Sequence, residues 1–340
     1  MRIGILTGGG DAQGLNAAIR AIVRKGTTAY GAEVLGFRNG WRGVMEGEVR
    51  ELTKESVQGI LHRGGTILGS SGADPYHEGG IERVRQTFAD LTLDGLIAIG
   101  GEGTLGAAAH MTREGLPVIG VPKTIDNDLS GTEACIGFNT AVQIATDAID
   151  RLHSTAESHN RVMVVEVMGR SSGCIALSAG LAGGADMILI PERPFDLAEV
   201  CAHLRRRHLG GHLFSIVVVA EGAQPVEGTM APVNHPIDER GFPRFGGIAH
   251  RIAPEIERIT GFETRVTVLG HVQRGGSPVA EDRILATRFG TAAVDVARRG
   301  GWGVMVALHG GEIIEVPLGQ AAKIRQVPEE LYPVAEVFFD

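Results

Sequence analysis

The chain has 340 residues, enough for two domains of ordinary size, and it contains 43% hydrophobic and 21% charged residues. Its net charge of −8 argues against nucleic acid as a main partner, and no apolar run approaches the ~20 residues that span a membrane. The three cysteines are too widely spaced for a disulfide framework, and a strand that begins at Arg2 leaves no room for a signal peptide. We therefore expect a cytoplasmic protein.

Short apolar runs alternate with amphipathic stretches almost from end to end. The expected strands are 2–7, 33–37, 94–100, 117–121, 162–167, 187–190, 214–220 and 266–270. The expected helices are 14–25, 104–113, 139–155, 173–181, 197–207, 248–259 and 282–299. This alternation predicts an α/β protein with parallel-rich, doubly wound sheets covered by helices on both faces.

The long helix at 139–155 is the expected divider between two doubly wound domains. Late elements are expected to cross back, so the first domain is predicted to comprise 1–137 plus 277–305 and the second 138–276 plus 306–340. The stretch 225–244, with four prolines and two glycines, is expected to be a long surface excursion.

A glycine-rich loop, Thr7–Asn16, follows the first strand and opens a helix. Its glycines allow backbone N–H groups to close on a phosphate at the helix N-terminus. The Gly8, Gly10, Gly14 spacing is one residue too long for a dinucleotide fingerprint, and the second strand ends without an acid for a ribose hydroxyl. No phosphate-loop pattern ending in Gly-Lys-Ser/Thr occurs either, so these two nucleotide folds are disfavoured.

A second glycine loop, Gly100–Thr104, again joins a strand to a helix and adds the carboxylate of Glu102. Beside bound phosphates such a group most simply serves Mg²⁺, although it could also cap the helix. The next strand leads into Pro122–Asp128, which places two carboxylates, a hydroxyl and an ammonium at the same sheet edge. One acid can take a proton while the other holds a metal, so the three loops together indicate phosphoryl transfer from a polyphosphate.

The second half supplies a different set of strand ends: Met168-Gly169-Arg170, Glu221-Gly222 and His271–Ser277. Arginine suits bidentate phosphate recognition, and a carboxylate can accept hydrogen bonds from sugar hydroxyls. This half is therefore expected to bind an anionic, hydroxylated acceptor. The histidines near Cys201 match no zinc spacing.

The motifs resemble those of the bacterial 6-phosphofructokinase family from Met1 through the last helix. They are Gly9-Gly10-Asp11, Gly64-Gly65-Thr66, Gly100–Thr104, Pro122–Asp128, Met168-Gly169-Arg170 and Gly270–Ser277. The resemblance implies two Rossmann-like domains with the active site in the cleft between them, the first domain binding the phosphate donor and the second binding fructose 6-phosphate. It also implies a glycolytic kinase that uses ATP and Mg²⁺ and forms a homotetramer.

Carried over position by position, the resemblance makes Asp126 the base for the sugar 1-hydroxyl, helped by Asp128, Thr124 and Arg170. Glu102 stands where the family usually has Asp as the Mg²⁺ ligand. The implied donor site comprises Gly10, Gly101, Gly103, Thr104 and Lys123. The implied fructose 6-phosphate site comprises Met168, Gly169, Arg170, Glu221, His271 and Arg274, together with Arg161 and Arg265 from a neighbouring subunit.

The donor is expected to depend on two positions. Pyrophosphate-using relatives resemble this chain at Lys123 but carry Asp in place of Gly103, where it would repel the α-phosphate of a nucleotide. Enterobacterial ATP-using relatives have Gly at both positions. The pair Gly103 and Lys123 is similar to that of ATP-dependent actinobacterial members, which favours ATP.

Three departures from the family pattern lie near the expected site. Gly72 replaces an arginine that helps to neutralise the transferring phosphate, Gln13 replaces a proline, and Ser171–Cys174 replaces His-Ala-Gly-Trp. They leave open a pyrophosphate-dependent enzyme, a paralogue for another sugar phosphate such as sedoheptulose 7-phosphate, or a catalytically silent sugar-phosphate sensor. Arg20 and Arg24 match effector-side arginines of the family, but the Lys-rich segment near Gly210-Gly211 is absent.

Overall fold

The computed structural model describes residues 1–76, 79–230 and 245–339 and divides into two compact units. Unit 1 comprises Met1–Thr140 and Arg274–Ile324, and unit 2 comprises Ala141–Gln273 and Arg325–Asp340. The expected surface excursion at 225–244 falls mostly on residues 231–244, which lie outside the described residues.

Unit 1 is built on a seven-stranded sheet in the order β11-β10-β5-β4-β1-β2-β3. Its strands are β1 (Arg2–Thr7), β2 (Glu33–Phe37), β3 (Val49–Glu51), β4 (Gly95–Gly100), β5 (Val118–Pro122), β10 (Val304–His309) and β11 (Glu312–Pro317). The neighbours from β10 to β2 pair in parallel, whereas β11 and β3 pair antiparallel at the two edges. Antiparallel edge strands on a parallel sheet are common in doubly wound folds.

Alternate side chains of the central strands of this sheet pack into two separate hydrophobic cores, one on each face. Ile97 and Ile99 face α1 (Leu15–Tyr30) and α9 (Ala280–Arg298), which pack against each other, while Leu96 and Ala98 face α3 (Gly80–Asp90) and α4 (Glu102–Arg113). A strand buried on both faces reads as a continuous apolar run, which is why the sequence predicts these strands well. The short helices α2 (Trp41–Glu46) and η2 (Leu318–Ala322) complete the cover.

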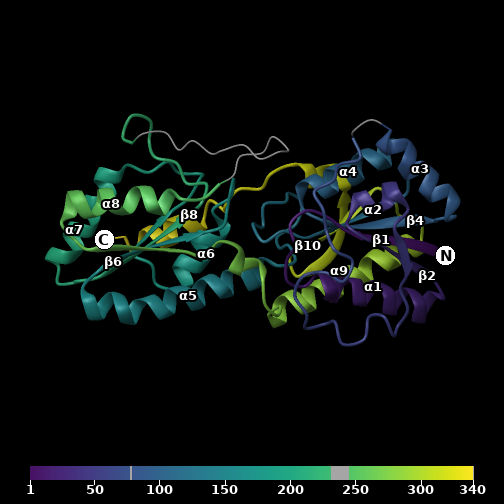
Figure 1. The fold of residues 1–340 in the computed structure, drawn as a ribbon, viewed down its shortest axis with the longest axis horizontal. Coiled ribbons are helices and arrows are strands. Elements are labelled where there is room, and N and C mark those ends of the chain that lie inside the picture. The colour runs from purple at the N-terminus through teal and green to yellow at the C-terminus, as the bar shows by residue number, and fades with distance from the viewer. Residues whose placement is uncertain (77–78, 231–244, 340) are drawn as a thin grey trace. The chain divides into compact units, whose positions relative to one another are not determined.

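Unit 2 is built on a fully parallel four-stranded sheet in the order β7-β8-β6-β9. Its strands are β6 (Val162–Val167), β7 (Met187–Leu189), β8 (Ser215–Ala220) and β9 (Thr264–Val268). Helices α7 (Leu197–Leu209) and α8 (Ile248–Thr260) cover one face, and α5 (Phe138–His159) and α6 (Cys174–Ala182) lie on the other (Figure 1). The 3₁₀ helix η1 (Gly270–Arg274) follows β9, and α10 (Leu331–Glu336) packs near α6.

The expected fold class is confirmed, but the expected domain boundaries differ from the two units. Residues 306–324 were expected in the second domain; they lie in unit 1 because β10 pairs with β5 and β11 with β10. Residues 138–140 and 274–276 were also expected in the second domain and lie in unit 1. The sequence reading did not identify α2, β3, α3, β10, β11 or α10.

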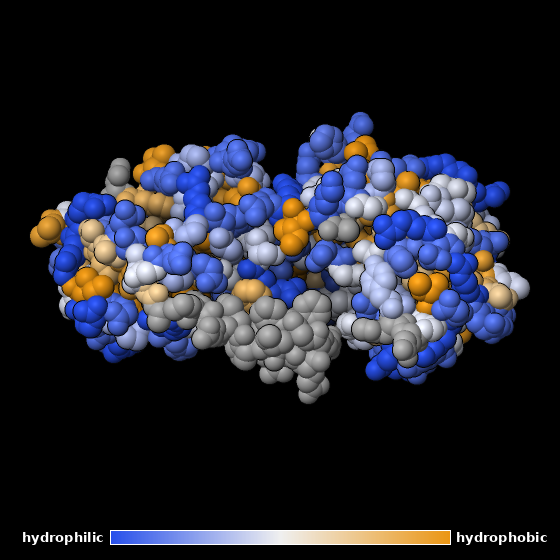
Figure 2. All heavy atoms as spheres, turned by 90° about the horizontal axis from the view of Figure 1, so that it is seen from above, coloured by the Kyte–Doolittle hydropathy of each residue, from blue (hydrophilic) through white to orange (hydrophobic). Residues whose placement is uncertain are grey.

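Exposed large hydrophobic side chains of the described residues include Leu209, Val272 and Val337. Figure 2 shows a mostly hydrophilic face on which hydrophobic atoms occur in small, scattered groups. Among the described helices, none is long and apolar enough to cross a lipid bilayer.

Candidate active site

Sheet order places three glycine- or acid-bearing loops next to one another in unit 1. Strands β5, β4 and β1 are parallel neighbours, so the loops that follow them leave the same edge of the sheet. These are the loops that the sequence assigns to the phosphate donor. Ligands of open α/β sheets bind at this edge.

The first loop is held by the segment around Ser70 and Ser71. Gly9 donates its N–H to the Ser71 carbonyl at 3.0 Å, and the Ser70 hydroxyl donates to the Gly9 carbonyl at 2.5 Å. Thr7 reaches the same segment through its hydroxyl, which donates to the Gly69 carbonyl at 2.8 Å. Gly9 has φ of 74°, a backbone conformation that a residue with a Cβ rarely adopts.

Lys123 lies beneath this loop with 2% of its surface exposed. Its ammonium donates to the carbonyl of Gly8 at 2.9 Å and to the carbonyl of Gly10. Burial, together with the nearby positive charge of Arg274, lowers the pKa of Lys123 to about 8, although the charges of Asp11 and Asp126 oppose this change. The lysine therefore places a positive charge beneath the loop, and this charge is easily lost at alkaline pH.

Arg274 was expected beside the sugar phosphate, in the second domain; in the structure it belongs to unit 1 and contacts the first loop. Its guanidinium donates to the Asp11 carbonyl at 2.9 Å, and a Cβ built on Gly10 would lie 2.7 Å from its Nη1 atom. Gly10 therefore leaves room for the arginine. Lys123 and Arg274 together give this loop two cations, which suits a bound phosphate.

The second loop packs against the first through Thr104. A Cβ at Gly8 would lie 2.5 Å from the Thr104 hydroxyl, and the Trp41 indole donates to the Thr104 carbonyl at 3.2 Å. Gly101 lies close to the third loop, because its Cβ would be 3.4 Å from the Lys123 carbonyl. Gly103 differs from these residues, since a Cβ there would meet nothing within 4 Å among the described residues.

The turn after β5 is shaped by the side chain of Asn127 and carries the two aspartates of the predicted site. Asn127 has φ of 51°, accepts the Cys135 N–H at 2.9 Å and donates to the Glu133 carbonyl at 3.1 Å, so its amide shapes the turn. Asp126 is buried, and its N–H donates to the Thr124 hydroxyl at 3.2 Å. Asp128 is half-buried.

Glu102 is suited to bind a magnesium ion whose other ligands are mainly substrate phosphates and water. It lies exposed in the first turn of α4, directly after the strand end that forms the second loop. No group of three His, Cys, Asp or Glu residues in the described part of the chain could hold a metal ion by itself. Mg²⁺ commonly binds through one or two carboxylates, substrate phosphates and water, which is the arrangement that a lone exposed carboxylate permits.

Unit 2 also has three loops at one edge of a parallel sheet, but these loops carry different side chains. Strands β8, β6 and β9 are parallel neighbours, so the predicted acceptor loops after them share one sheet edge. Met168 donates its N–H to the Gln273 side chain at 2.8 Å, and Gly222 donates to the Gly169 carbonyl at 3.1 Å. A Cβ at Gly222 would lie 1.9 Å from the Arg170 carbonyl, so the backbones of the first two loops are in close contact.

The side chains of this edge are accessible. Arg170 and His271 are exposed, and Glu221 is half-buried directly after β8, where its N–H donates to the Val167 carbonyl at 2.8 Å. A guanidinium, an imidazole and a carboxylate at one edge can recognise a phosphorylated, hydroxylated ligand.

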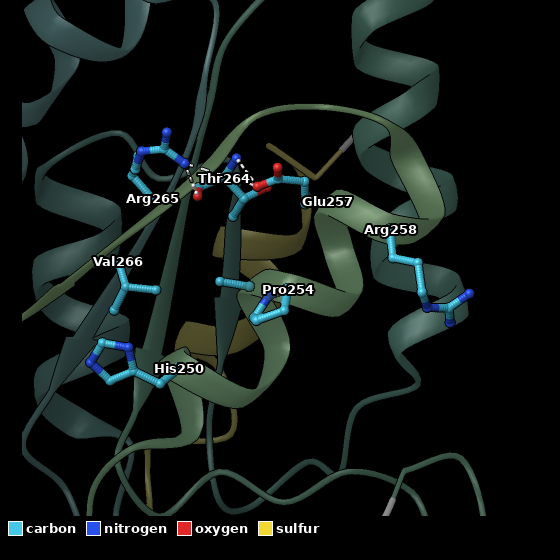
Figure 3. Close-up of a pocket in the computed structure, with 8 residues that line it drawn as sticks. His250, Pro254, Glu257, Arg258, Thr264, Arg265 and Val266 are labelled. Atoms are coloured by element: carbon cyan, nitrogen blue, oxygen red, sulfur yellow. Dashed lines mark hydrogen bonds and ion pairs between the residues drawn. The ribbon is translucent and has the colours of Figure 1, made fainter.

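The two remaining predicted arginines lie elsewhere in unit 2. Arg161 and Arg265 both pair with Glu263, the former at 2.8 Å. Arg265 also lines a surface cavity of about 630 Å³ between α8 and β9, together with His250, Pro254 and Glu257. Figure 3 shows Arg265 beside Thr264 and Glu257, while Arg258 points away from them. This cavity contains none of the loop residues described above.

Two of the family departures have a local structural account. Gln13 is fully buried and donates to the Gly275 carbonyl at 2.5 Å, a link that a proline could not make. Ser172 and Cys174 are buried at the start of α6, whereas Ser171 is exposed. Gly72 is exposed next to the serines that hold the first loop; nothing in the structure explains the missing arginine.

Sequence reasoning missed several polar residues that shape both edges. Asn16 accepts the Ile67 N–H at 2.8 Å and donates to the Gly64 carbonyl at 3.2 Å, which fixes the segment behind the first loop. Gln273 and Glu192 fix the loop after β6. Gln273 lies inside a recognised motif, but its sequence neighbours give no sign that it faces Met168.

The fold and the loops define a two-unit α/β protein with paired cations at a glycine loop in one unit and an arginine-bearing strand edge in the other. The phosphofructokinase family model matches residues 2–297, and the chain therefore belongs to the phosphofructokinase family of phosphotransferases.

Relatives with two different donors resemble the chain to a similar degree. It is 56% identical to a pyrophosphate–fructose 6-phosphate 1-phosphotransferase of Amycolatopsis methanolica, with 100% of both chains covered. It is 52% identical to an ATP-dependent 6-phosphofructokinase of Mycobacterium leprae, again with 100% of both covered. A crystal structure of Pichia pastoris phosphofructokinase in the T-state matches with a TM-score of 0.82 and 32% identity, over 99% of this chain and 36% of that one.

Proposed function

We propose that the protein transfers the γ-phosphoryl group of ATP to the 1-hydroxyl of fructose 6-phosphate, as a 6-phosphofructokinase of glycolysis. The observation that carries this proposal is the pair of cations, Lys123 and Arg274, on the carbonyls of the first glycine loop. Lys123 lies within electrostatic range of Arg274 and of Asp126, the proposed base. Phosphoryl transfer needs such preorganised positive charge around the transferring group.

Asp126 is the proposed general base. Its place after β5, next to the loops of β4 and β1, allows it to accept the proton of the attacking hydroxyl. The Thr124 hydroxyl, which accepts the Asp126 N–H, holds the start of the turn, and Asp128 supports the base from the same turn. Gly10, Gly101 and Thr104 shape the donor loops around the phosphates.

Glu102 is the proposed ligand of Mg²⁺. When bound, the ion would neutralise charge on the donor phosphates. The exposure of Glu102 at the N-terminus of α4 supports this role, because its carboxylate can turn toward a phosphate-held ion.

The acceptor is proposed to lie against the loops of unit 2. Arg170 would neutralise phosphate charge during transfer, and Met168 and Gly169 would line the sugar. Glu221 and His271 would hydrogen-bond its hydroxyls and phosphate. Arg274 has two candidate ligands, the acceptor phosphate and the donor phosphates, because it also contacts the first loop.

ATP is favoured as donor by the space at Gly103. A nucleotide needs room beyond the β-phosphate, and Gly103 leaves that room within the described structure. Three residues further along α4, a Cβ at Gly106 would lie 3.9 Å from the hydroxyl of Tyr76. The Tyr76 ring is 47% exposed and packs edge-on against His110, with centroids 5.0 Å apart. An exposed aromatic ring on this side of α4 suits a stacked base.

Pyrophosphate remains the second candidate donor, because the Amycolatopsis relative with 56% identity is named for it. Another acceptor, such as sedoheptulose 7-phosphate, and a silent sensor are the further alternatives that Gly72 motivates.

The deciding experiment measures Mg²⁺-dependent formation of fructose 1,6-bisphosphate with ATP and with pyrophosphate in parallel. Turnover with ATP alone is the expected result. Turnover with pyrophosphate alone contradicts the donor assignment, and turnover only with sedoheptulose 7-phosphate contradicts the acceptor. Binding of fructose 6-phosphate without turnover under either donor would establish the sensor.

Assembly into a homotetramer and a cytoplasmic location stay predictions. The proposal that Arg161 and Arg265 serve a neighbouring subunit is supported by their accessibility: the side chains are 26% and 52% exposed, although both pair with Glu263.

A further inference from the structure

The loop that carries Arg170 is fixed at three points. Its start is held by the Gln273 side chain at Met168, and its middle by Gly222 at Gly169. Its end is held by Glu192, whose two carboxylate oxygens each lie 3.0 Å from the N–H of Gly173. The first two supports come from segments that themselves carry proposed acceptor residues, whereas Glu192 comes from outside them.

Glu192 also holds the C-terminal segment. Its Oε1 atom accepts the N–H of Val327 at 3.1 Å, so one carboxylate joins two backbone segments far apart in the sequence. The fit at Gly173 is tight, because a Cβ there would lie 2.4 Å from Ile190 and 3.0 Å from the Glu192 carboxylate. A shift of Glu192 therefore moves the end of the Arg170 loop.

The residues around this link fix the C-terminal segment on unit 2. Arg193, next to Glu192, pairs with Glu336 at 2.9 Å and stacks 4.0 Å over the ring of Tyr332. The Tyr332 hydroxyl donates to the Ile188 carbonyl at 3.2 Å. Val327 and Ala335 bury their side chains. Since ion pair, ring stacking and burial act together, the Val327 N–H is presented to Glu192 by an ordered segment.

We propose that Glu192 is a positioning residue that couples the C-terminal segment 325–339 to the acceptor loop 168–173 and thereby sets the affinity for the sugar phosphate. The inference rests on the proposed function of Arg170. Glu192 does not touch the reacting atoms. It acts through the backbone of Gly173, because a carboxylate that accepts backbone N–H groups fixes where the preceding residues lie.

The test compares Glu192→Ala and Glu192→Gln with Glu329→Ala, an exposed glutamate of the same segment, as matched control. Glu192→Ala is expected to raise the KM for fructose 6-phosphate by about three- to tenfold, the effect of one or two lost hydrogen bonds, with kcat and the donor KM unchanged. Glu192→Gln retains one acceptor oxygen, so its KM for fructose 6-phosphate is expected to lie between those of the parent and of Glu192→Ala. The control is expected to leave all three constants as in the parent.

A second variant tests the link to the C-terminal segment. Val327→Pro keeps an apolar side chain but removes the N–H that Glu192 accepts. It is expected to raise the KM for fructose 6-phosphate. In the double variant with Glu192→Ala, the effects of the two substitutions on this KM are expected to be less than additive.

Three outcomes would overturn the proposal: an unchanged KM for fructose 6-phosphate in Glu192→Ala, equal loss of affinity for both substrates together with a lowered Tm, or full additivity with Val327→Pro. Absence of any phosphorylation of fructose 6-phosphate in the parent protein would refute the proposed function instead. In that case direct binding of fructose 6-phosphate, measured by calorimetry on the same variants, still tests the link.

Discussion

Lys123 gives the first glycine loop a positive charge that depends on pH. Its ammonium is buried on the carbonyls of Gly8 and Gly10, and burial lowers its pKa to about 8. Raising the pH through about 8 removes a positive charge from the floor of the loop. Between this value and the ordinary value of 10.5, the unfolded chain binds more protons than the folded one, so this group's contribution to the free energy of unfolding rises with pH.

The first prediction concerns this charge. The donor KM is expected to rise as the pH passes from about 7 to about 9.5, because the neutral amine attracts phosphate less strongly. Lys123→Met keeps much of the side-chain length but has no charge, so its donor KM is expected to be high and flat over the same range. Steady-state kinetics at each pH measure both, with the exposed Lys54→Met as control. An identical pH profile in Lys123→Met would rule out Lys123 as the titrating group.

Gly103 gives the second residue-scale prediction. Gly103→Asp has room for its side chain, so it is expected to fold normally, raise the KM for ATP at least tenfold by charge repulsion, and spare pyrophosphate use. The control is Gly319→Asp, because a Cβ at Gly319 also meets nothing within 4 Å. Undiminished ATP turnover in Gly103→Asp would contradict the donor assignment.

At the scale of elements, buried carboxylates fix the starts of two helices, α8 and α5. Glu166, in β6, accepts the N–H groups of Gly247 at 2.8 Å and Ala249 at 2.9 Å at the start of α8. Asp282, in the first turn of α9, does the same for α5: it accepts the N–H groups of Gly137 at 3.0 Å and Thr140 at 2.8 Å and the Thr140 hydroxyl at 2.5 Å. A side chain on a distant segment thus replaces the local cap that the start of each helix lacks.

The third prediction follows from Asp282. Burial raises the pKa of its carboxyl group, while the three hydrogen bonds oppose that change. Asp282→Ala leaves the three donors buried without an acceptor and is expected to lower the free energy of unfolding by about 2–4 kcal/mol. Urea unfolding measures the change, with the exposed neighbour Glu281→Ala as control. A loss equal to that of the control would show that α5 does not depend on this cap.

The local hydrophobic pattern predicted most strands of both sheets, but it did not predict the short edge strand β3 or the strands β10 and β11. Their pairing with β5 joins segments far apart in the sequence, and β11 is largely exposed, so it lacks the apolar run of a buried strand. The same long-range pairing places residues 306–324 in unit 1.

At the scale of the whole molecule, the predicted assembly would let Arg161 and Arg265 serve the site of a neighbouring subunit. Both pair with Glu263 in unit 2, and Arg265 lines the surface cavity of Figure 3. A neighbouring subunit's phosphate would compete with Glu263 for these guanidinium groups, since arginine pairs well with either anion.

The fourth prediction tests this sharing. Asp126→Asn and Arg265→Ala are each expected to be nearly inactive when assembled alone. If one chain supplies Asp126 and its neighbour supplies Arg265, unfolding the two variants together and refolding them as a mixture restores about a quarter of the sites. Activity after co-refolding measures this, with separately refolded variants as control. No recovery, once mixed oligomers are shown by mass spectrometry, would place both residues in the same chain.

The sequence by itself determined the α/β class, the strand ends that carry glycine, acid and arginine, and membership of the family, because these depend on local apolar runs and on contiguous motifs. Only the tertiary structure decided that Arg274 lies on the first loop, that Lys123 is buried on carbonyls 115 and 113 residues away, and that Glu192 joins Gly173 to Val327. The physical reason is that burial and hydrogen-bond partners depend on strand order and long-range packing. Neighbouring residues in the sequence do not encode these locally.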